Sequence, residues 1–260
     1  MVFHFDFLMN RYKESFDIIY EYRAMFLYGA LTTLGITFVS TLAGTFLGLI
    51  SALARLTRFE KGGPSLQALS WILRQLSLIY VTLFRGTPLF VQIFIWYFVW
   101  FPILVNPSNG WIIQGDMAVE LRRSYGALIA GILALSFNSG AYITEIFRAG
   151  IQSIDRGQIE AARSLGLSYP QALRYVILPQ AIRRMLPPFG NEFITLLKDS
   201  SLVSSIAVVE LAFVAKTIAG RYSVYEEPYY TIAVIYLVMT VALSLFFSWL
   251  EKRYNRHRHL

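Results

Sequence analysis

The amino-acid sequence predicts an all-α integral membrane protein with five transmembrane helices. Its 260 residues are 56% hydrophobic and only 15% charged, whereas about a quarter of the residues in soluble domains are charged. Several apolar stretches reach the ~20 residues that a helix needs to cross a bilayer. Lysines and arginines gather on alternate sides of these stretches, a pattern typical of membrane topology. The net charge of +7 therefore reports orientation, and we expect no nucleic acid as a partner.

Residues 1–23 mix aromatic and charged side chains, and we expect an extracytoplasmic, amphipathic segment on the membrane surface. A frayed terminus is the alternative, and a cleavable signal is not expected because charges interrupt any apolar core. Residues 24–54 carry no charge and form the first predicted span. Within them, Gly44 and Gly48 stand four positions apart, a spacing that lets another helix approach closely.

The second predicted span contains a break. Large apolar side chains recur at alternating three- and four-residue steps, which predicts an amphipathic helix, and they are Leu66, Leu69, Leu73, Leu76, Tyr80 and Leu83. The sequence Phe84-Arg85-Gly86-Thr87-Pro88 then interrupts helical geometry. The apolar run 89–101 is too short to cross alone, so the span must include residues before the break. Backbone groups freed at the break must then face protein or a water-filled cavity at membrane depth.

Three further spans follow a polar loop that is expected at residues 102–123. Residues 181–188 are expected to form a basic, proline-rich approach to the bilayer, and residues 221–227 a short polar loop. The fourth span is expected to be interrupted at Lys198-Asp199-Ser200-Ser201. The three expected spans are residues 125–147, 189–219 and 228–250, and a basic cytoplasmic tail follows at 251–260.

The placement of lysine and arginine orients the chain, because cytoplasmic loops are enriched in these residues. Fourteen basic residues fall on one alternating side and six on the other. We therefore expect the C-terminus and the polar segment after the third span in the cytoplasm, and the N-terminus outside. The larger set is Arg55, Arg58, Lys61, Arg74, Arg148, Arg156, Arg163, Arg174, Arg183, Arg184, Lys252, Arg253, Arg256 and Arg258, and the smaller set is Arg11, Lys13, Arg23, Arg122, Arg123 and Arg221.

The polar segment at residues 158–179 predicts two short helices between the third and fourth spans. The first is expected to stop at Gly166, which can take the left-handed C-cap conformation. The second is expected to begin with Ser168 as N-cap, Pro170 in the first turn and Gln171 in a capping box. Pro179 is expected to end it, because proline lacks an amide proton and clashes with the preceding turn.

This segment resembles the EAA loop of ABC importer permeases. The resemblance lies in Glu160-Ala161-Ala162, Gly166 and Val176-Ile177-Leu178-Pro179 at matching spacing, with valine at 176 where the family usually has isoleucine. An interfacial helix pair without a partner is the alternative. The resemblance implies coupling helices, within residues 155–180, that sit in grooves of ATPase subunits. It assigns that contact to Glu160, Ala161, Ala162, Arg163, Leu165 and Gly166.

Three further motifs are similar to the permease subunits of polar amino-acid importers, and the match covers residues 24–250. Such permeases form homo- or heterodimers on two ATP-binding subunits, and they receive solute from an extracytoplasmic binding protein in the bacterial inner membrane. ATP and magnesium are accordingly expected on the partner subunits, with no cofactor or metal in this chain. The chain departs from the family in its longer 102–123 loop and extended N-terminus. The motifs are Arg85-Gly-Thr-Pro-Leu-Phe-Val-Gln92, Phe137-Asn-Ser-Gly-Ala-Tyr-Ile-Thr-Glu-Ile-Phe-Arg-Ala-Gly150 and Gly190-Asn-Glu-Phe-Ile-Thr-Leu-Leu-Lys-Asp-Ser-Ser-Leu-Val-Ser204.

Polar side chains at membrane depth are expensive, and they are the candidate solute ligands. A zwitterion needs donors for its carboxylate and acceptors for its ammonium group, and three converging spans supply both. The alternative is that Lys198 and Asp199 pair with other protein residues and hold the bundle together. Arg85 and Glu145 fit structural or gating pairs better than ligands. The candidate ligands are Thr87, Gln92, Asn138, Tyr142, Glu192, Lys198, Asp199 and Ser200.

Other function classes fit the sequence less well. The chain has no phosphate-binding glycine loop and no cysteine, and its histidines lie at positions 4, 257 and 259, so an enzyme is not expected. A self-contained ion-coupled carrier, with Glu192, Lys198 and Asp199 as coupling groups, is the main alternative, although no internal repeat favours it. The sequence selects neither the amino acid carried nor a homodimer over a heterodimer.

Overall fold

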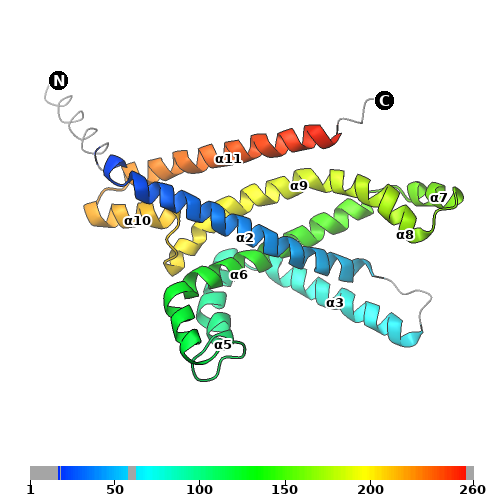
Figure 1. Cartoon of the computed structure of the whole chain (residues 1–260), viewed down its shortest axis with the longest axis horizontal. Coiled ribbons are helices and arrows are strands. Elements are labelled where there is room, and N and C mark those ends of the chain that lie inside the picture. The colour runs from blue at the N-terminus through cyan, green and yellow to red at the C-terminus, as the bar shows by residue number, and fades with distance from the viewer. Residues whose placement is uncertain (1–16, 18, 58–62, 256–260) are drawn as a thin grey trace.

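The computed structural model describes residues 17, 19–57 and 63–255, and the described part is helical without a named strand (Figure 1). Four helices are long and apolar enough to cross a membrane, or up to five if a bent pair counts as one span. The expected N-terminal segment and basic tail lie largely outside the described residues, as do Arg58 and Lys61. The four helices are α2 (Arg23–Leu56), α3 (Pro64–Gly86), α6 (Gly115–Gln152) and α11 (Glu226–Asn255).

Among the helices that the structure describes, α2 and α6 form the most extensive contact. A Cβ atom added to Gly44 would lie 3.1 Å from the Ser136 carbonyl oxygen, and one added to Gly48 would lie 2.8 Å from Ile143 Cγ2. The first distance is tight and the second leaves no room for a side chain, so the glycine pair lets the two helix backbones approach as predicted.

The break after α3 lies where the sequence predicts it. Helix α3 ends at Gly86, and α4 (Leu89–Ile95) begins directly after Pro88. Helix α4 continues through a π-helical turn, η1 (Trp96–Trp100), into α5 (Phe101–Leu104). This second apolar stretch, Leu89–Leu104, is shorter than the four candidate spans.

The predicted bounds of the 102–123 loop are wrong at both ends, because α5 occupies its start and α6 begins at Gly115. Only residues 105–114 lie between the two helices. Residues 116–123 contain good helix formers whose charges face solvent, and Ala118 is fully buried against Phe101, Val105 and Ala130. A charged helical turn outside the apolar stretch therefore looks like a loop when hydropathy alone is considered.

The prediction that Pro179 ends a short helix is also wrong. Helices α8 (Tyr169–Ala172), η2 (Leu173–Ile177) and α9 (Leu178–Asp199) follow one another without a gap. The five residues of η2 form a π-helical turn, in which the Leu178 amide donates to the Leu173 carbonyl. This wider turn accommodates the proline at the start of α9. Pro187 and Pro188 also lie inside α9, so residues 181–188 are helical and continue directly into the expected fourth span.

The predicted interruption near residue 198 is confirmed and extends further than expected. Helix α9 ends at Asp199 and leads into a 3-10 helix, η3 (Ser200–Ile206). Ala207 has a φ of 63°, and α10 (Leu211–Tyr222) continues at 46° to the preceding helix. The predicted polar loop at 221–227 is reduced to residues 223–225, because α11 already begins at Glu226.

Glu210, which is fully buried, holds the start of α10. Its carboxylate accepts hydrogen bonds from the amides of Ala212 and Phe213 at 2.9 and 2.8 Å. The Tyr236 hydroxyl of α11 and the Thr33 hydroxyl of α2 also donate to it, at 3.0 and 3.4 Å. One carboxylate thus caps α10 and ties it to two other helices.

Candidate functional site

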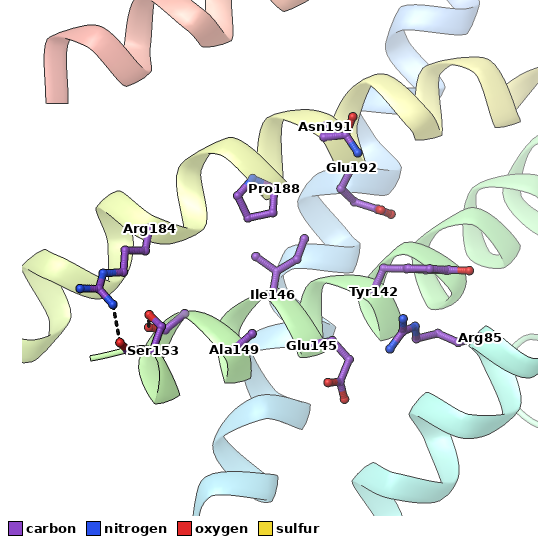
Figure 2. Close-up of a pocket in the computed structure, with 11 residues that line it drawn as sticks. Arg85, Tyr142, Glu145, Ile146, Ala149, Ser153, Arg184, Pro188, Asn191 and Glu192 are labelled. Atoms are coloured by element: carbon purple, nitrogen blue, oxygen red, sulfur yellow. Dashed lines mark hydrogen bonds between the residues drawn. The ribbon is translucent and has the colours of Figure 1, made fainter. Parts of the chain in front are cut away.

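A cavity of about 520 Å³ lies between the end of α3, the second half of α6 and the middle of α9 (Figure 2). It is amphipathic, because charged and amide side chains share its wall with aliphatic ones. Its lining residues are Arg85, Tyr142, Glu145, Ile146, Ala149, Gly150, Ser153, Arg184, Pro188, Asn191 and Glu192.

Arg85 and Glu192 give this cavity two charges of opposite sign. The Arg85 guanidinium lies 4.9 Å from the centre of the Tyr142 ring, a cation–π contact. Among the described residues, no carboxylate lies within ion-pair distance of Arg85. The carboxylate of Glu192 accepts a hydrogen bond from the Ser139 hydroxyl at 3.0 Å and forms no ion pair within the described chain. The cavity therefore presents two guanidinium groups, those of Arg85 and Arg184, and one carboxyl group, that of Glu192, which form no ion pair with a described residue.

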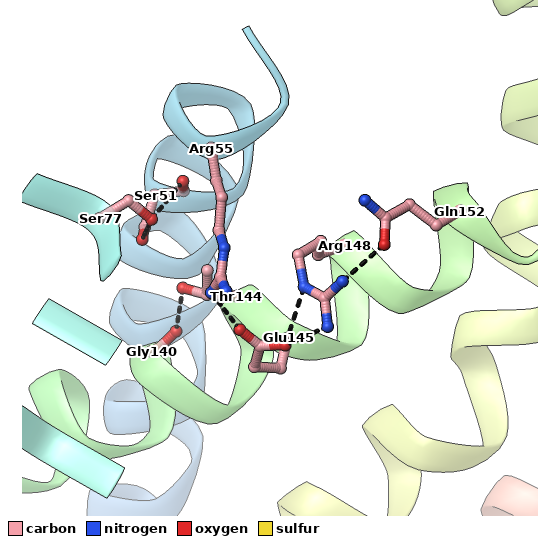
Figure 3. Close-up of polar contacts among 8 residues, drawn as sticks. All are labelled: Ser51, Arg55, Ser77, Gly140, Thr144, Glu145, Arg148 and Gln152. Carbon is pink, nitrogen blue, oxygen red and sulfur yellow. Dashed lines mark hydrogen bonds and ion pairs between the residues drawn. The ribbon is translucent and has the colours of Figure 1, made fainter. Parts of the chain in front are cut away.

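Glu145 is held differently, in a polar network shown in Figure 3. Its carboxylate forms an ion pair with Arg55 at the end of α2 and a second one, at 2.6 Å, with Arg148 on its own helix. Arg148 also donates to the Gln152 side chain at 2.5 Å. These contacts join α2 to the last turns of α6, so Glu145 takes part in structural ion pairs. Its partners are Arg55 and Arg148, and Arg85 is not one of them.

The first three candidate ligands lie together at the break after α3. Gln92 donates to the Thr87 hydroxyl and to the Phe84 carbonyl, both at 2.8 Å. Asn138 of α6 donates to the Phe84 carbonyl and to the Gln92 side-chain oxygen, both at 3.0 Å. Gln92 and Asn138 are 5% and 7% exposed. These side chains thus satisfy backbone groups that the break leaves without helical partners, and they do not line the cavity.

Lys198, Asp199 and Ser200 lie at the C-terminal end of α9, outside the cavity lining. Lys198 is exposed and Asp199 half-buried, and neither forms an ion pair with another described residue. The buried Ser200 hydroxyl donates to the Leu197 carbonyl at 2.7 Å. Of the eight candidate ligands, the structure brings only Tyr142 and Glu192 into the cavity.

The expected coupling segment is built as the sequence predicts up to its second helix. Helix α7 (Arg156–Ser164) begins with Asp155, whose carboxylate accepts from the Gly157 amide at 2.7 Å. Gly166 has a φ of +86° and ends the helix, and the Ser168 amide donates to the Gln171 side chain at 2.8 Å. The surface of this turn is open, since Leu165 is 84% exposed while Ala162 is buried. Glu160, Ala161, Arg163 and Gly166 are exposed as well.

Sequence reasoning missed Arg184 and Asn191, which share one face of α9 with Pro188 and Glu192. The signal was present, because positions 184, 188 and 191 follow helical spacing. The prolines at 187 and 188 argued against a helix there. Arg184 is also tied to α6, since its guanidinium donates to the Ser153 carbonyl.

The family model described as "Binding-protein-dependent transport system inner membrane component" matches residues 44–256. The chain is 40% identical over 225 residues to the probable amino-acid ABC transporter permease protein YckA of Bacillus subtilis, covering 86% of this chain and 87% of YckA. It is 35% identical over 241 residues to the probable glutamine ABC transporter permease protein GlnM of the same organism, covering 92% and 98%. The chain also resembles the crystal structure of an amino acid ABC transporter with histidines, with a TM-score of 0.72. The two sequences are 37% identical, and the match covers 90% of this chain and 96% of the chain in that structure.

Proposed function

This chain belongs to the family of binding-protein-dependent transport system inner membrane components, and from that membership we propose how its own residues move a solute. The chain is the permease subunit of an ATP-driven amino-acid importer, and it provides the path across the membrane by alternating access. ATP hydrolysis belongs to a separate subunit. The relatives favour this function over a self-contained ion-coupled carrier.

The observation that carries the proposed solute site is the pair of opposite charges in the cavity. An amino-acid zwitterion carries an ammonium group and a carboxylate that are separated by one carbon atom. Arg85 offers donors to the carboxylate and Glu192 accepts from the ammonium group. Tyr142 and Asn191 line the same cavity, and their polar atoms add hydrogen-bonding capacity. An unpaired charge inside a membrane protein is costly, so a ligand that compensates both groups is favoured.

The other candidate ligands have supporting places in this proposal. Thr87, Gln92 and Asn138 stabilise the break that puts Arg85 at the end of α3. Lys198, Asp199 and Ser200 are the second candidate solute contact, nearer the bend between α9 and α10. Equilibrium binding of labelled amino acids distinguishes these two candidate solute contacts.

That assay measures equilibrium binding of labelled amino acids, taken from a panel that includes glutamine, to the purified permease–ATPase complex without the binding protein. Loss of one charge-assisted hydrogen bond costs about 1.5–3 kcal/mol, which corresponds to a roughly ten- to hundredfold weaker affinity. We expect this loss for Arg85→Gln and for Glu192→Gln. Arg183→Gln is the matched control, because Arg183 is exposed on α9 and does not line the cavity.

Wild-type affinity in both cavity variants would contradict the proposed site. If Asp199→Asn weakens binding instead, the solute contact lies at the end of α9. If Asp199→Asn only lowers the unfolding temperature, Asp199 belongs to the scaffold.

We also propose a five-span topology, with the N-terminus outside and the C-terminus and residues 155–180 in the cytoplasm of a bacterial cell. The bent pair of α9 and α10 then counts as the fourth span, within a permease domain of residues 24–250. The basic bias of fourteen residues against six supports this orientation. In the cysteine-free chain, an impermeant maleimide should label a cysteine at Ser108 and miss one at Ser168 in intact cells. Labelling of both positions would contradict the topology.

The exposed turn from Glu160 to Gly166 supports the proposed role of α7 in contacting an ATPase subunit. Ile177, Ala181 and Met185 pack with Ile154 in one buried cluster, which fixes the coupling segment to α9. A rigid connection of this kind can transmit closure of the ATPases to the cavity wall as a rigid-body motion. The proposed assembly has two ATPase subunits, which bind ATP and magnesium, a second permease subunit and an extracytoplasmic solute-binding protein.

A further inference from the structure

The loop of residues 105–114 displays two adjacent large apolar side chains. Trp111 is 79% exposed and Ile112 is 72% exposed. The loop connects α5 to α6 and lies far from α7 and α8 in Figure 1. Exposed neighbouring apolar side chains of this size indicate a surface that contacts something other than water.

The loop is held rigidly by its own hydrogen bonds. The amides of Trp111 and Ile112 donate back to the carbonyls of Ile103 and Leu104 at 3.0 and 2.9 Å. The Gly110 amide donates to Asn106 at 3.1 Å, and the Gln114 side chain donates to Gly110 at 2.7 Å. The exposure of the two side chains is therefore a fixed feature of the fold.

The Trp111 side chain continues an apolar surface that begins on the preceding helix. It lines a groove of about 470 Å³ together with Phe98, Val99, Pro102 and Ile103. Phe98 is 62% and Val99 is 49% exposed. Asn106 and Asn109 line the same groove. The apolar surface formed by Phe98, Val99 and Trp111 therefore borders on two amide side chains just after α5 ends.

We propose that Trp111 and Ile112 insert into the boundary between the headgroups and acyl chains of the membrane leaflet opposite the coupling segment. The apolar stretch Leu89–Leu104 ends at this loop, so a bilayer that covers its exposed face also reaches the two loop side chains. Tryptophan favours this boundary because its ring is apolar and its indole N–H can donate to a polar group. The asparagines beside it can donate to phosphate or ester oxygens. Phospholipid is thus the partner, and the loop anchors the α5–α6 connection at a fixed depth.

Single cysteines in the otherwise cysteine-free chain test this proposal. Ile112→Cys carries a spin label in the complete importer, reconstituted in nanodiscs of phosphatidylethanolamine and phosphatidylglycerol. Ser108→Cys, on the same loop, is the matched control. We expect the label at 112 to collide with oxygen and to lose access to a water-soluble nickel chelate, while the label at 108 keeps that access. Trp111→Cys provides a second reporter, and it should behave like position 112.

Three outcomes would overturn the proposal. Nickel access at 112 equal to that at 108 would mean that the side chain faces water. Protection of 112 that arises only after purified solute-binding protein is added would mean that the loop is a docking site for that protein. A label immobilised equally in detergent and in nanodiscs would mean that a second protein surface, such as another copy of this chain, covers it.

Discussion

The contact between α2 and α6 predicts that alanine changes stability differently at two glycines of α2, Gly48 and Gly35. A Cβ atom at Gly48 would lie 2.8 Å and 2.9 Å from Ile143 side-chain carbons and 3.0 Å from the Gly140 carbonyl oxygen. Carbon atoms prefer separations of about 3.5–4.0 Å, and the carbonyl belongs to the backbone of α6. At Gly35, by contrast, a Cβ would meet nothing within 4 Å.

The two alanine substitutions isolate the clash, because both exchange glycine for alanine inside the same helix. Gly35→Ala should stabilise the protein by about 0.5–1 kcal/mol through helix propensity alone. Gly48→Ala gains the same amount but loses about 1–3 kcal/mol through overpacking. The two variants should therefore differ by about 1–3 kcal/mol in stability.

Thermal unfolding of the purified complex, followed by size-exclusion chromatography, measures this difference. For a chain of this size, about 2–4 °C per kcal/mol places the Gly48→Ala midpoint roughly 2–12 °C below that of Gly35→Ala. Equal midpoints, or a higher midpoint for Gly48→Ala, would refute the inference that the two helix backbones touch at Gly48.

Three further substitutions test other parts of the structure. Gly166→Val should cost about 1–2 kcal/mol in the left-handed conformation and reduce co-purification of the ATPase, whereas Gly166→Asn should be tolerated; equal recovery for both would contradict the coupling role. Gly110→Ala places a Cβ 2.2 Å from the Ile113 carbonyl oxygen, so it should speed limited proteolysis of the 105–114 loop, and an unchanged rate would argue against the rigid loop. Glu145→Gln leaves Arg55 and Arg148 without their carboxylate and should lower stability by about 1–3 kcal/mol. Only the part of this loss that comes from Arg55 should disappear in a Glu145→Gln, Arg55→Met double variant, and an undiminished loss would argue against the Arg55 ion pair as a cause.

Local signals in the sequence predicted much of the fold. The glycines at 44 and 48, the break at Thr87-Pro88 and the left-handed Gly166 each depend on a property of one or two residues, and each prediction is confirmed. The prediction that Pro179 ends a helix was wrong because the effect of proline on a regular α-helix does not apply to the wider turn that precedes this residue. A π-helical turn just before Pro179 lets the helix continue, and hydropathy does not reveal such a turn.

The candidate site was less predictable, because its residues meet only in three dimensions. Tyr142 and Glu192 were found from their membrane depth. Arg85 was assigned to a structural or gating pair, since its distance from any carboxylate depends on how α3 packs beside α6. Arg184 and Asn191 were missed because two neighbouring prolines concealed the helical face that carries them.

The buried carboxylate of Glu210 constrains the order in which the chain is made. Its hydrogen-bond donors come from positions 33, 212, 213 and 236, so the last one leaves the ribosome only after α10 is complete. Until α11 has entered the membrane, this carboxylate lacks one donor and the start of α10 lacks its covering helix. The C-terminal helix therefore closes the bundle, because it supplies the last hydrogen bond to Glu210 and the side chains that cover the start of α10.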